Sequence, residues 1–154
     1  MSEVSCSAHA RCARAPSLRT HNMSKSNYRD LLVWQKARVL AKDIYILTRS
    51  FPRNETFGLV SQMRRTAVSI VCNIAEGQGR WTRPDYRRFL LIARGSAFEL
   101  EAQLIIAQDI GYIEDVEELT ERAIEITRML NGLLRYVAKV LRKPPAPRPL
   151  RPAP

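Results

Sequence analysis

A chain of 154 residues with a net charge of +10 is long enough to bury one hydrophobic core without help from metals or disulfides. Its three cysteines form no Cys-x-x-Cys pair, which argues against a disulfide framework and a zinc site. Both histidines, His9 and His21, lie near the start, so the rest of the chain has no imidazole to activate a nucleophile. We expect a cytoplasmic protein with no cofactor, no metal and no catalytic residues, and no stretch is apolar enough to span a membrane.

The positive charge is concentrated near the two ends of the sequence. Residues 1–27 carry a net +3 and residues 139–154 a net +5, whereas residues 28–138 carry only +2. The first segment is rich in Ser, Ala and Arg and has no apolar period, which predicts a disordered N-terminal extension. Met23 is an expected start of the working protein, and a transit peptide is the alternative for this segment. Residues 143–154 contain six prolines and are predicted to form an extended basic tail.

Between these segments, apolar residues recur at steps of three and four, which is typical of amphipathic helices. Four such series follow one another: Val33, Ala37, Leu40, Ile44, Leu47 and Phe51; Leu59, Met63, Ala67, Ile70 and Ile74; Tyr86, Leu90, Ala93, Ala97, Leu100, Leu104 and Ala107; Val116, Leu119, Ala123, Ile126, Leu130, Leu133, Val137 and Val140. No segment alternates like a strand. The pattern predicts an all-α, antiparallel up-down-up-down four-helix bundle over residues 28–142.

Helix boundaries are marked by residues with special backbone chemistry. The first helix is predicted to end at Phe51 and Pro52. Gly77 and Gly79 are interpreted as a helix stop and a turn, because a dinucleotide-binding loop would need a preceding strand and a third glycine at position 82. The segment 82–85, Thr-Arg-Pro-Asp, predicts the N-terminal cap of the third helix, and Gly111 predicts its end.

Two of the predicted helices carry a polar stripe beside their apolar one. The second helix has Gln62, Thr66, Ser69, Asn73, Glu76 and Arg80, and the third has Ser96, Glu99 and Gln103. We favour a hydrogen-bonded network, within one chain or between subunits, because polar groups on packed faces need partners. A ligand or RNA surface and a catalytic site are the weaker alternatives. Gln62, Ser69, Asn73, Glu76, Ser96, Glu99 and Gln103 are therefore assigned to structure or assembly. Cys72 is predicted to be a small buried side chain.

Arginines cluster on the second and third helices and around the turn that joins them. They are Arg64, Arg65, Arg80, Arg83, Arg87, Arg88 and Arg94, with Trp81 among them. Guanidinium groups bind phosphate in a bidentate manner and stack on bases, and an indole ring offers a further stacking surface. An alternative interpretation pairs these arginines with the acidic start of the fourth helix, residues 114–118, in the same or a neighbouring subunit.

Several stretches resemble a known family. "DLLVWQKA" (30–37), "FGLVSQMRRTAVSIVCNIAEGQGR" (57–80), "RFLLIARGSAFELEAQL" (88–104) and "GYI" (111–113) are similar to the bundle proteins encoded by intervening sequences in bacterial 23S rRNA genes. The resemblance implies a four-helix bundle, homo-oligomerisation, with a pentamer as the expected form, and no enzyme activity. More distantly, the chain resembles accessory proteins of diversity-generating retroelements, which bind a reverse transcriptase and nucleic acid.

The residues and the resemblance together predict a non-catalytic, oligomeric protein that binds nucleic acid or acts as a scaffold. Structured RNA is favoured over DNA as the partner. Arg64, Arg65, Arg80, Trp81, Arg83, Arg87 and Arg88 are the predicted contacts. The alternative is a protein-interaction scaffold, for example an accessory subunit of a reverse transcriptase.

Overall fold

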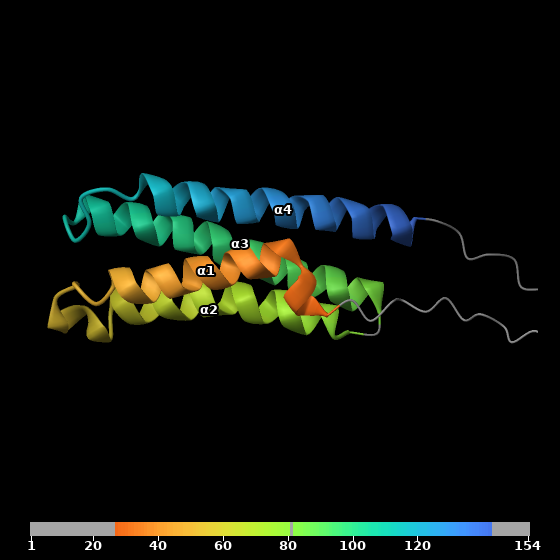
Figure 1. Cartoon of the computed structure of the whole chain (residues 1–154), viewed down its shortest axis with the longest axis horizontal. Coiled ribbons are helices and arrows are strands. Elements are labelled where there is room, and N and C mark those ends of the chain that lie inside the picture. The colour runs from red at the N-terminus through yellow and green to blue at the C-terminus, as the bar shows by residue number, and fades with distance from the viewer. Residues whose placement is uncertain (1–26, 81, 143–154) are drawn as a thin grey trace, which may run out of the picture.

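A computed structural model describes residues 27–80 and 82–142; predictions about residues 1–26, Trp81 and residues 143–154 lie outside the described residues. The described part contains four α-helices and no strand, which confirms the all-α bundle (Figure 1). The elements are the 3-10 turn η1 (Tyr28–Asp30), α1 (Leu32–Leu47), the 3-10 turn η2 (Arg53–Thr56), α2 (Leu59–Gln78), α3 (Arg83–Asp109) and α4 (Glu117–Leu141).

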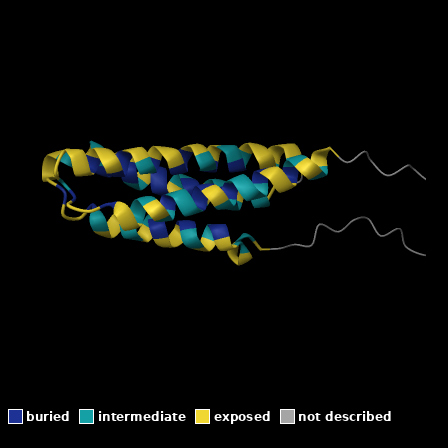
Figure 2. Ribbon diagram, turned by 90° about the horizontal axis from the view of Figure 1, so that it is seen from above, coloured by how far each residue is buried: buried dark blue, intermediate teal, exposed yellow. Residues whose placement is uncertain are grey.

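Successive helices run antiparallel, and each buries one apolar face against its neighbours (Figure 2). The ten large side chains that are almost fully buried come from all four helices: Leu40, Ile44, Met63, Ile70, Ile74, Leu90, Leu100, Leu104, Ile126 and Leu130. All of them belong to the apolar series read from the sequence. At roughly 1.5–3 kcal/mol for each buried side chain, this core is the main source of stability.

The predicted ends of α3 are confirmed at atomic detail. The Thr82 hydroxyl accepts a hydrogen bond from the Asp85 backbone N–H at 3.2 Å, which caps the first turn. At the other end, Gly111 adopts φ +85°, a conformation that disfavours any residue with a Cβ. There the Tyr112 N–H donates to the Ala107 carbonyl at 2.9 Å, which closes the helix.

Two predicted boundaries were wrong. The first helix ends at Leu47 rather than at Phe51, because the chain turns at Thr48, whose hydroxyl donates to the Ile44 carbonyl at 2.8 Å. Phe51 still packs in the core, 5.3 Å from the ring centre of Tyr112. Gly77 does not stop α2 but lies inside it, and the helix continues to Gln78, with Gly79 after its end.

One predicted burial, that of Cys72, was wrong, and Leu133 of the fourth apolar series is only partly buried against the core. Cys72 is exposed on α2, because it falls on the side of the helix away from the apolar stripe. In α4, Leu134 is buried and Leu133 is only half-buried, although the seven-residue step favours Leu133. A straight helix has 3.6 residues per turn, so its buried face drifts by about 20° per heptad relative to a strict seven-residue repeat.

Candidate nucleic-acid interface

The turn between α2 and α3 is built on a close approach of the two helices. A Cβ added at Gly77 would lie 2.9 Å from the Phe89 Cβ and 3.1 Å from a ring carbon of Tyr86. Glycine at this position therefore lets α3 start directly against the end of α2. Burial raises the pKa of the Tyr86 hydroxyl, which reflects the same close packing.

Arg80 is held in place at this corner by two neighbours. Its guanidinium forms an ion pair with Glu76, one helical turn earlier, and lies 4.6 Å from the centre of the Phe89 ring. About half of each charged side chain remains exposed, so the pair contributes little to stability. Its effect is to fix the guanidinium over the start of α3. The assembly role assigned to Glu76 stays a prediction.

The first two turns of α3 carry cations that the chain itself does not neutralise. Arg87 and Arg88 are exposed, and Arg83 is partly buried. None of these three side chains forms a hydrogen bond or an ion pair with another described residue. Adjacent residues on a helix point about 100° apart, so Arg87 and Arg88 extend the positive surface around α3.

The structure separates two of the predicted contacts from this corner. Arg64 turns towards α1, where its Nε donates to the Thr48 hydroxyl at 2.8 Å and its guanidinium lies 5.0 Å from the Tyr45 ring centre. Arg65 is exposed and donates to Gln62 at 2.7 Å. At 1.5 Å per residue, both lie roughly 20 Å along α2 from Arg80. The sequence alone did not show that the Arg64 side chain connects α2 to Tyr45 and Thr48 at the end of α1.

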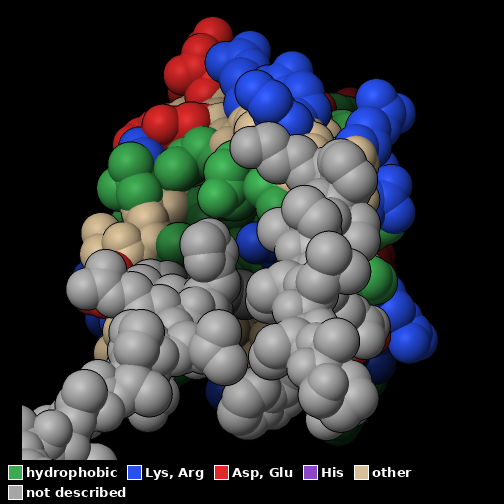
Figure 3. Space-filling view, turned by 90° about the vertical axis from the view of Figure 1, so that its right-hand side faces the viewer, with side chains coloured by type: hydrophobic (Ala, Val, Ile, Leu, Met, Phe, Trp, Pro, Cys, Tyr) green, Lys and Arg blue, Asp and Glu red, His purple; other side chains and the backbone are tan. Residues whose placement is uncertain are grey.

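The fold brings further positively charged side chains to the end of the bundle that holds the α2–α3 turn. The end of α2, the start of α3, the start of η1 and the end of α4 share one end of the bundle (Figure 1). We call this the basic end and define its side chains as Arg80, Arg83, Arg87, Arg88, Arg135, Lys139 and Arg142. Figure 3 shows Lys and Arg side chains along the upper and right-hand rim of its visible part, around hydrophobic side chains.

Three members of the basic end were missed by the sequence analysis. Arg135, Lys139 and Arg142 lie on the last turns of α4 or directly after it, and all are exposed. Lys139 and Arg142 were counted only in the charge of residues 139–154, and Arg135 only in that of residues 28–138. The signal was the antiparallel topology, which brings the end of the fourth helix to the start of the third.

The opposite end of the bundle carries the acidic residues of the α3–α4 connection and of the start of α4: Asp109, Glu114, Asp115, Glu117 and Glu118. The arginines of the corner therefore cannot pair with the start of α4 in the same chain, since the 27-residue α3 separates them by about 40 Å. Glu118 pairs instead with Arg122, four residues later. The intrachain form of that alternative is wrong, and the intersubunit form stays a prediction.

The two polar stripes meet between α2 and α3 within one chain. Gln103 Nε2 donates to the Glu99 carboxylate at 3.2 Å and lies 3.3 Å from the Thr66 hydroxyl, which is 3.2 Å from the same carboxylate. Further along, the Ser69 and Ser96 hydroxyls are 2.9 Å apart, and Asn73 Nδ2 donates to Ser69. We call this hydrogen-bonded series the polar seam. Most of these polar atoms find a partner within the chain, although Gln103 Oε1 is buried without one among the described residues.

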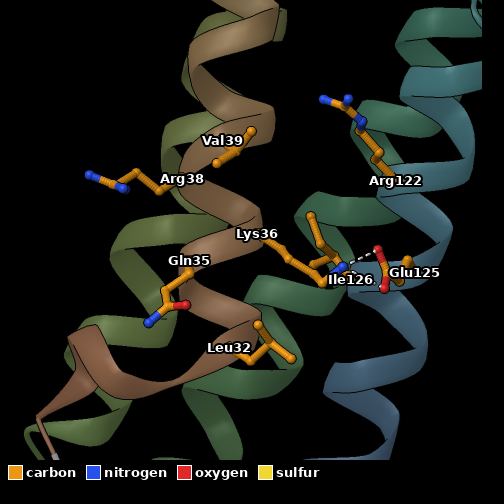
Figure 4. Close-up of a pocket in the computed structure, with 8 residues that line it drawn as sticks. All are labelled: Leu32, Gln35, Lys36, Arg38, Val39, Arg122, Glu125 and Ile126. Atoms are coloured by element: carbon orange, nitrogen blue, oxygen red, sulfur yellow. Dashed lines mark hydrogen bonds and ion pairs between the residues drawn. The ribbon is translucent and has the colours of Figure 1, made fainter.

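The α1–α4 side of the bundle is more open than the polar seam. A groove of about 500 Å³ runs between the two helices, lined by residues that include Leu32, Lys36, Val39 and Ile126. Lys36 reaches across it to Glu125 at 2.7 Å, as Figure 4 shows. A second bridge joins Arg122 to Asp43 at 2.6 Å.

Leu32, Val39 and Ile46 lie seven residues apart along α1 and are 56%, 45% and 49% exposed. We call these three residues the α1 stripe. A seven-residue step keeps apolar residues on one face of a helix, which is the pattern of helix–helix contacts. The α1 stripe has no helix packed over it within the described residues.

Comparison with known proteins identifies the family. The sequence model of the 23S rRNA-intervening sequence proteins matches residues 29–132, which is more than half of the chain. The chain belongs to this family. The resemblance read from the sequence is thus confirmed, and the family's description names no enzyme activity. A comparison with curated protein sequences finds no match.

This chain has a fold similar to that of a solved structure from Bacteroides thetaiotaomicron. That structure is a crystal structure of a protein of unknown function from the S23 ribosomal protein family. It is 27% identical to this chain, with a TM-score of 0.62 over 67% of this chain and 95% of the other. Among the described residues of the present protein, no group of His, Cys, Asp and Glu could hold a metal, and no helix is long and apolar enough to cross a membrane.

Proposed function

We propose that this protein is a non-catalytic RNA-binding protein whose basic end contacts structured RNA. The observation that carries the proposal is the convergence of exposed arginines from α3 and α4 at one end of the bundle. Within the described residues, Arg87, Arg88, Arg135 and Arg142 have no acidic partner. Cations without partners are free to neutralise phosphates, and the counterions released on binding supply affinity.

The position of the chain ends supports the same proposal. Asn27 and Arg142, the first and last described residues, lie at the basic end (Figure 1). The segments that continue from them, 1–26 and 143–154, each carry a net charge of +3. The positive charge of these two sequence segments would strengthen the attraction of a polyanion. The family's description and the S23 ribosomal name of its relative both refer to ribosomal RNA or the ribosome.

A four-arginine variant tests the proposal. Arg80, Arg83, Arg87 and Arg88 would be changed together to Gln, and RNA affinity would be measured by gel shift at two salt concentrations. We expect binding to fall sharply and its log–log salt slope to become shallower by about 0.7–0.9 for each phosphate that the variant no longer neutralises. Unchanged affinity would contradict the proposal.

A matched control removes the same charge elsewhere. Arg38, Lys42, Arg49 and Arg53 are exposed on α1 and the following turn, and changing all four to Gln lowers the net charge equally. The control should retain most of the RNA affinity. Equal losses in both variants would mean that net charge, and not the basic end, determines binding. Thermal unfolding of both variants confirms that each is folded.

Self-association is a second property that one observation favours. The hydrogen bonds of the polar seam that are present join α2 and α3 of one chain, which supports a surface other than the seam for association. The α1 stripe instead offers an exposed apolar face. We propose that the chain forms a homo-oligomer, with a pentamer as the form implied by the family resemblance, through this stripe. Sedimentation would detect it, and a monomer at micromolar concentration would contradict it.

The scaffold alternative uses the same surface. A protein partner such as a reverse transcriptase could be held on the α1 stripe while the basic end remains available to RNA. A variant of the α1 stripe that loses a protein partner, but keeps its RNA affinity, would support the scaffold alternative. The four-arginine variant should show the opposite behaviour.

A further inference from the structure

Arginines recur on α4 at a seven-residue step. Arg128, Arg135 and Arg142 are all exposed, and the last of them directly follows the end of the helix. Seven residues make almost two turns, so the three side chains leave the same flank of α4. At 1.5 Å per residue they are spaced by roughly 10 Å and span roughly 20 Å along the helix. We call them the arginine row.

The arginine row differs from the other arginine of α4 in its partners. Arg122 is occupied by Asp43 and Glu118. Arg128, Arg135 and Arg142 form no ion pair or hydrogen bond with any described residue. Each therefore presents a guanidinium with up to five N–H donors to solvent.

The packing of α3 on α4 extends the arginine row. Arg94 Nη1 donates to Asn131 Oδ1 at 3.1 Å, which fixes how the two antiparallel helices are aligned. Arg87 precedes Arg94 by two turns, so it lies opposite the part of α4 two turns after Asn131, between Arg135 and Arg142. Because Arg87 is exposed and unpaired, it joins the arginine row to the basic end. The seventh residue before Arg128 is Glu121, where the row of positive charge stops.

We infer that the arginine row, with Arg87, binds the sugar-phosphate backbone of double-helical RNA lying along the α3–α4 flank. This inference rests on the proposed function and names the form of RNA that the protein takes. A duplex presents its phosphates outward and its bases inward, so a rigid line of guanidiniums can engage it without reading sequence. Arginine suits this role because its planar fork binds phosphate in a bidentate manner.

A single strand is less well matched to this flank. Proteins that bind single strands place aromatic side chains under successive bases. The α4 face between the arginines offers Asn131 and Ala138 instead. Two exposed aromatic side chains lie on these helices: Tyr136, which leaves α4 about 100° around the helix from Arg135, and Phe98 of α3. Two rings on different helices do not make a stacking platform.

Two probes and two variants test the inference. One probe is an RNA duplex of arbitrary sequence and about 20 base pairs, a length comparable with the span of a double-stranded RNA-binding domain. The other probe is a single strand of uridines of the same length. The first variant changes Arg128, Arg135 and Arg142 to Gln. The second, the matched control, changes Arg38, Lys42 and Arg49 to Gln and removes the same charge from exposed positions of α1 and the turn after it.

The wild type should bind the duplex more tightly than the single strand. The arginine-row variant should reduce the log–log salt slope for the duplex by about two to three, because each phosphate left unneutralised removes about 0.7–0.9 from it. The control should change the slope by less than about one. Equal changes in the two variants would overturn the inference, as would a preference for the single strand that Tyr136→Ala or Phe98→Ala abolishes.

Failure of the inference and failure of the proposed function give different results. If the wild type binds neither probe, the proposed function fails, and the inference fails with it. If the four-arginine variant of the basic end loses RNA while the arginine-row variant behaves like its control, the proposed function stands and the inference is overturned. Thermal unfolding of each variant tests whether misfolding causes a loss of binding. We expect all variants to fold, because Gln is almost as good a helix former as Arg.

Discussion

The α2–α3 contact and the α1–α4 contact of the bundle are formed by different kinds of side chain. Between α2 and α3, Gly77 removes the side chain that would keep the helices apart, and short polar residues such as Ser69 and Ser96 bond across the contact. Between α1 and α4, long charged pairs such as Lys36–Glu125 bridge a groove of about 500 Å³. The α2–α3 contact is therefore closely packed, whereas the α1–α4 contact is bridged by long charged side chains across an open groove.

From this difference we expect the α2–α3 contact to determine the stability of the fold and the surface along α1 to be available to other molecules. Short polar groups at a close contact lose their solvent and must keep their partners, so they specify how the helices align. Exposed ion pairs keep most of their solvent and contribute little. We therefore expect substitutions in the polar seam to change folding, and substitutions along α1 to change association with other molecules.

The largest effect is expected from Gly77→Ala. The new Cβ would lie 2.9 Å from the Phe89 Cβ, so α3 must shift or repack, at a cost of about 1–3 kcal/mol in the free energy of unfolding. Chemical denaturation of the purified protein measures the change.

Gly95→Ala is the matched control, because a Cβ at Gly95 meets nothing within 4 Å. This substitution lies in the interior of α3 and should stabilise the protein by roughly 0.5–1 kcal/mol, since alanine favours a helix over glycine. If both substitutions stabilised the protein, the close approach at Gly77 would not restrict packing.

Ser69→Ala should have the next largest effect. Ser96 is only 9% exposed and would lose the hydroxyl that lies 2.9 Å from its own, which leaves a buried polar group unpaired. The expected loss of stability is about 1–2 kcal/mol. Changing Ser69 and Ser96 together should cost less than the sum of the single changes, and the double-mutant cycle measures this coupling. Additive losses would show that the two hydroxyls act independently.

The sequence predicted the helices and most of the core because both depend on local periodicity. Val33 to Ile44 and Leu90 to Ala107 fall on the faces that the apolar step assigns. The caps at Thr82 and Gly111 were also predictable, since each acts on neighbouring backbone. The role of Gly77 was not, because it depends on Phe89 and Tyr86 of another helix.

The candidate site was predicted less well than the fold, for the same physical reason. Arg87 and Arg88 were assigned to the candidate site from their position after the α2–α3 turn; both are exposed, and their contact with RNA stays a prediction. Arg64 was wrongly grouped with them, because its use by Thr48 and Tyr45 of α1 depends on tertiary packing. Arg135 joins the site only through the antiparallel return of α4. A list of arginines does not reveal which of them are already occupied.

Breaking the Lys36–Glu125 bridge should have a smaller effect than either change in the polar seam. Both side chains are more than a third exposed, and such pairs contribute about 0.2–1 kcal/mol. Lys36→Gln should therefore lower stability by less than about 1 kcal/mol, and added salt should shrink the difference from the wild type. A loss as large as that of Ser69→Ala would show that the α2–α3 and α1–α4 contacts do not differ as described.

The smallest effect on folding is expected from the α1 stripe, where Val39 and Ile46 are about half exposed. Changing both to Gln removes little buried area, so the free energy of unfolding should stay within about 0.5 kcal/mol of the wild type. The same change should weaken self-association, because it replaces the apolar face that a second copy would cover. Sedimentation velocity over a range of concentrations measures the association, and denaturation of the same samples measures the stability. An unfolding loss comparable with that of Gly77→Ala would place these side chains in the core of the folded chain rather than on a surface left open for another molecule.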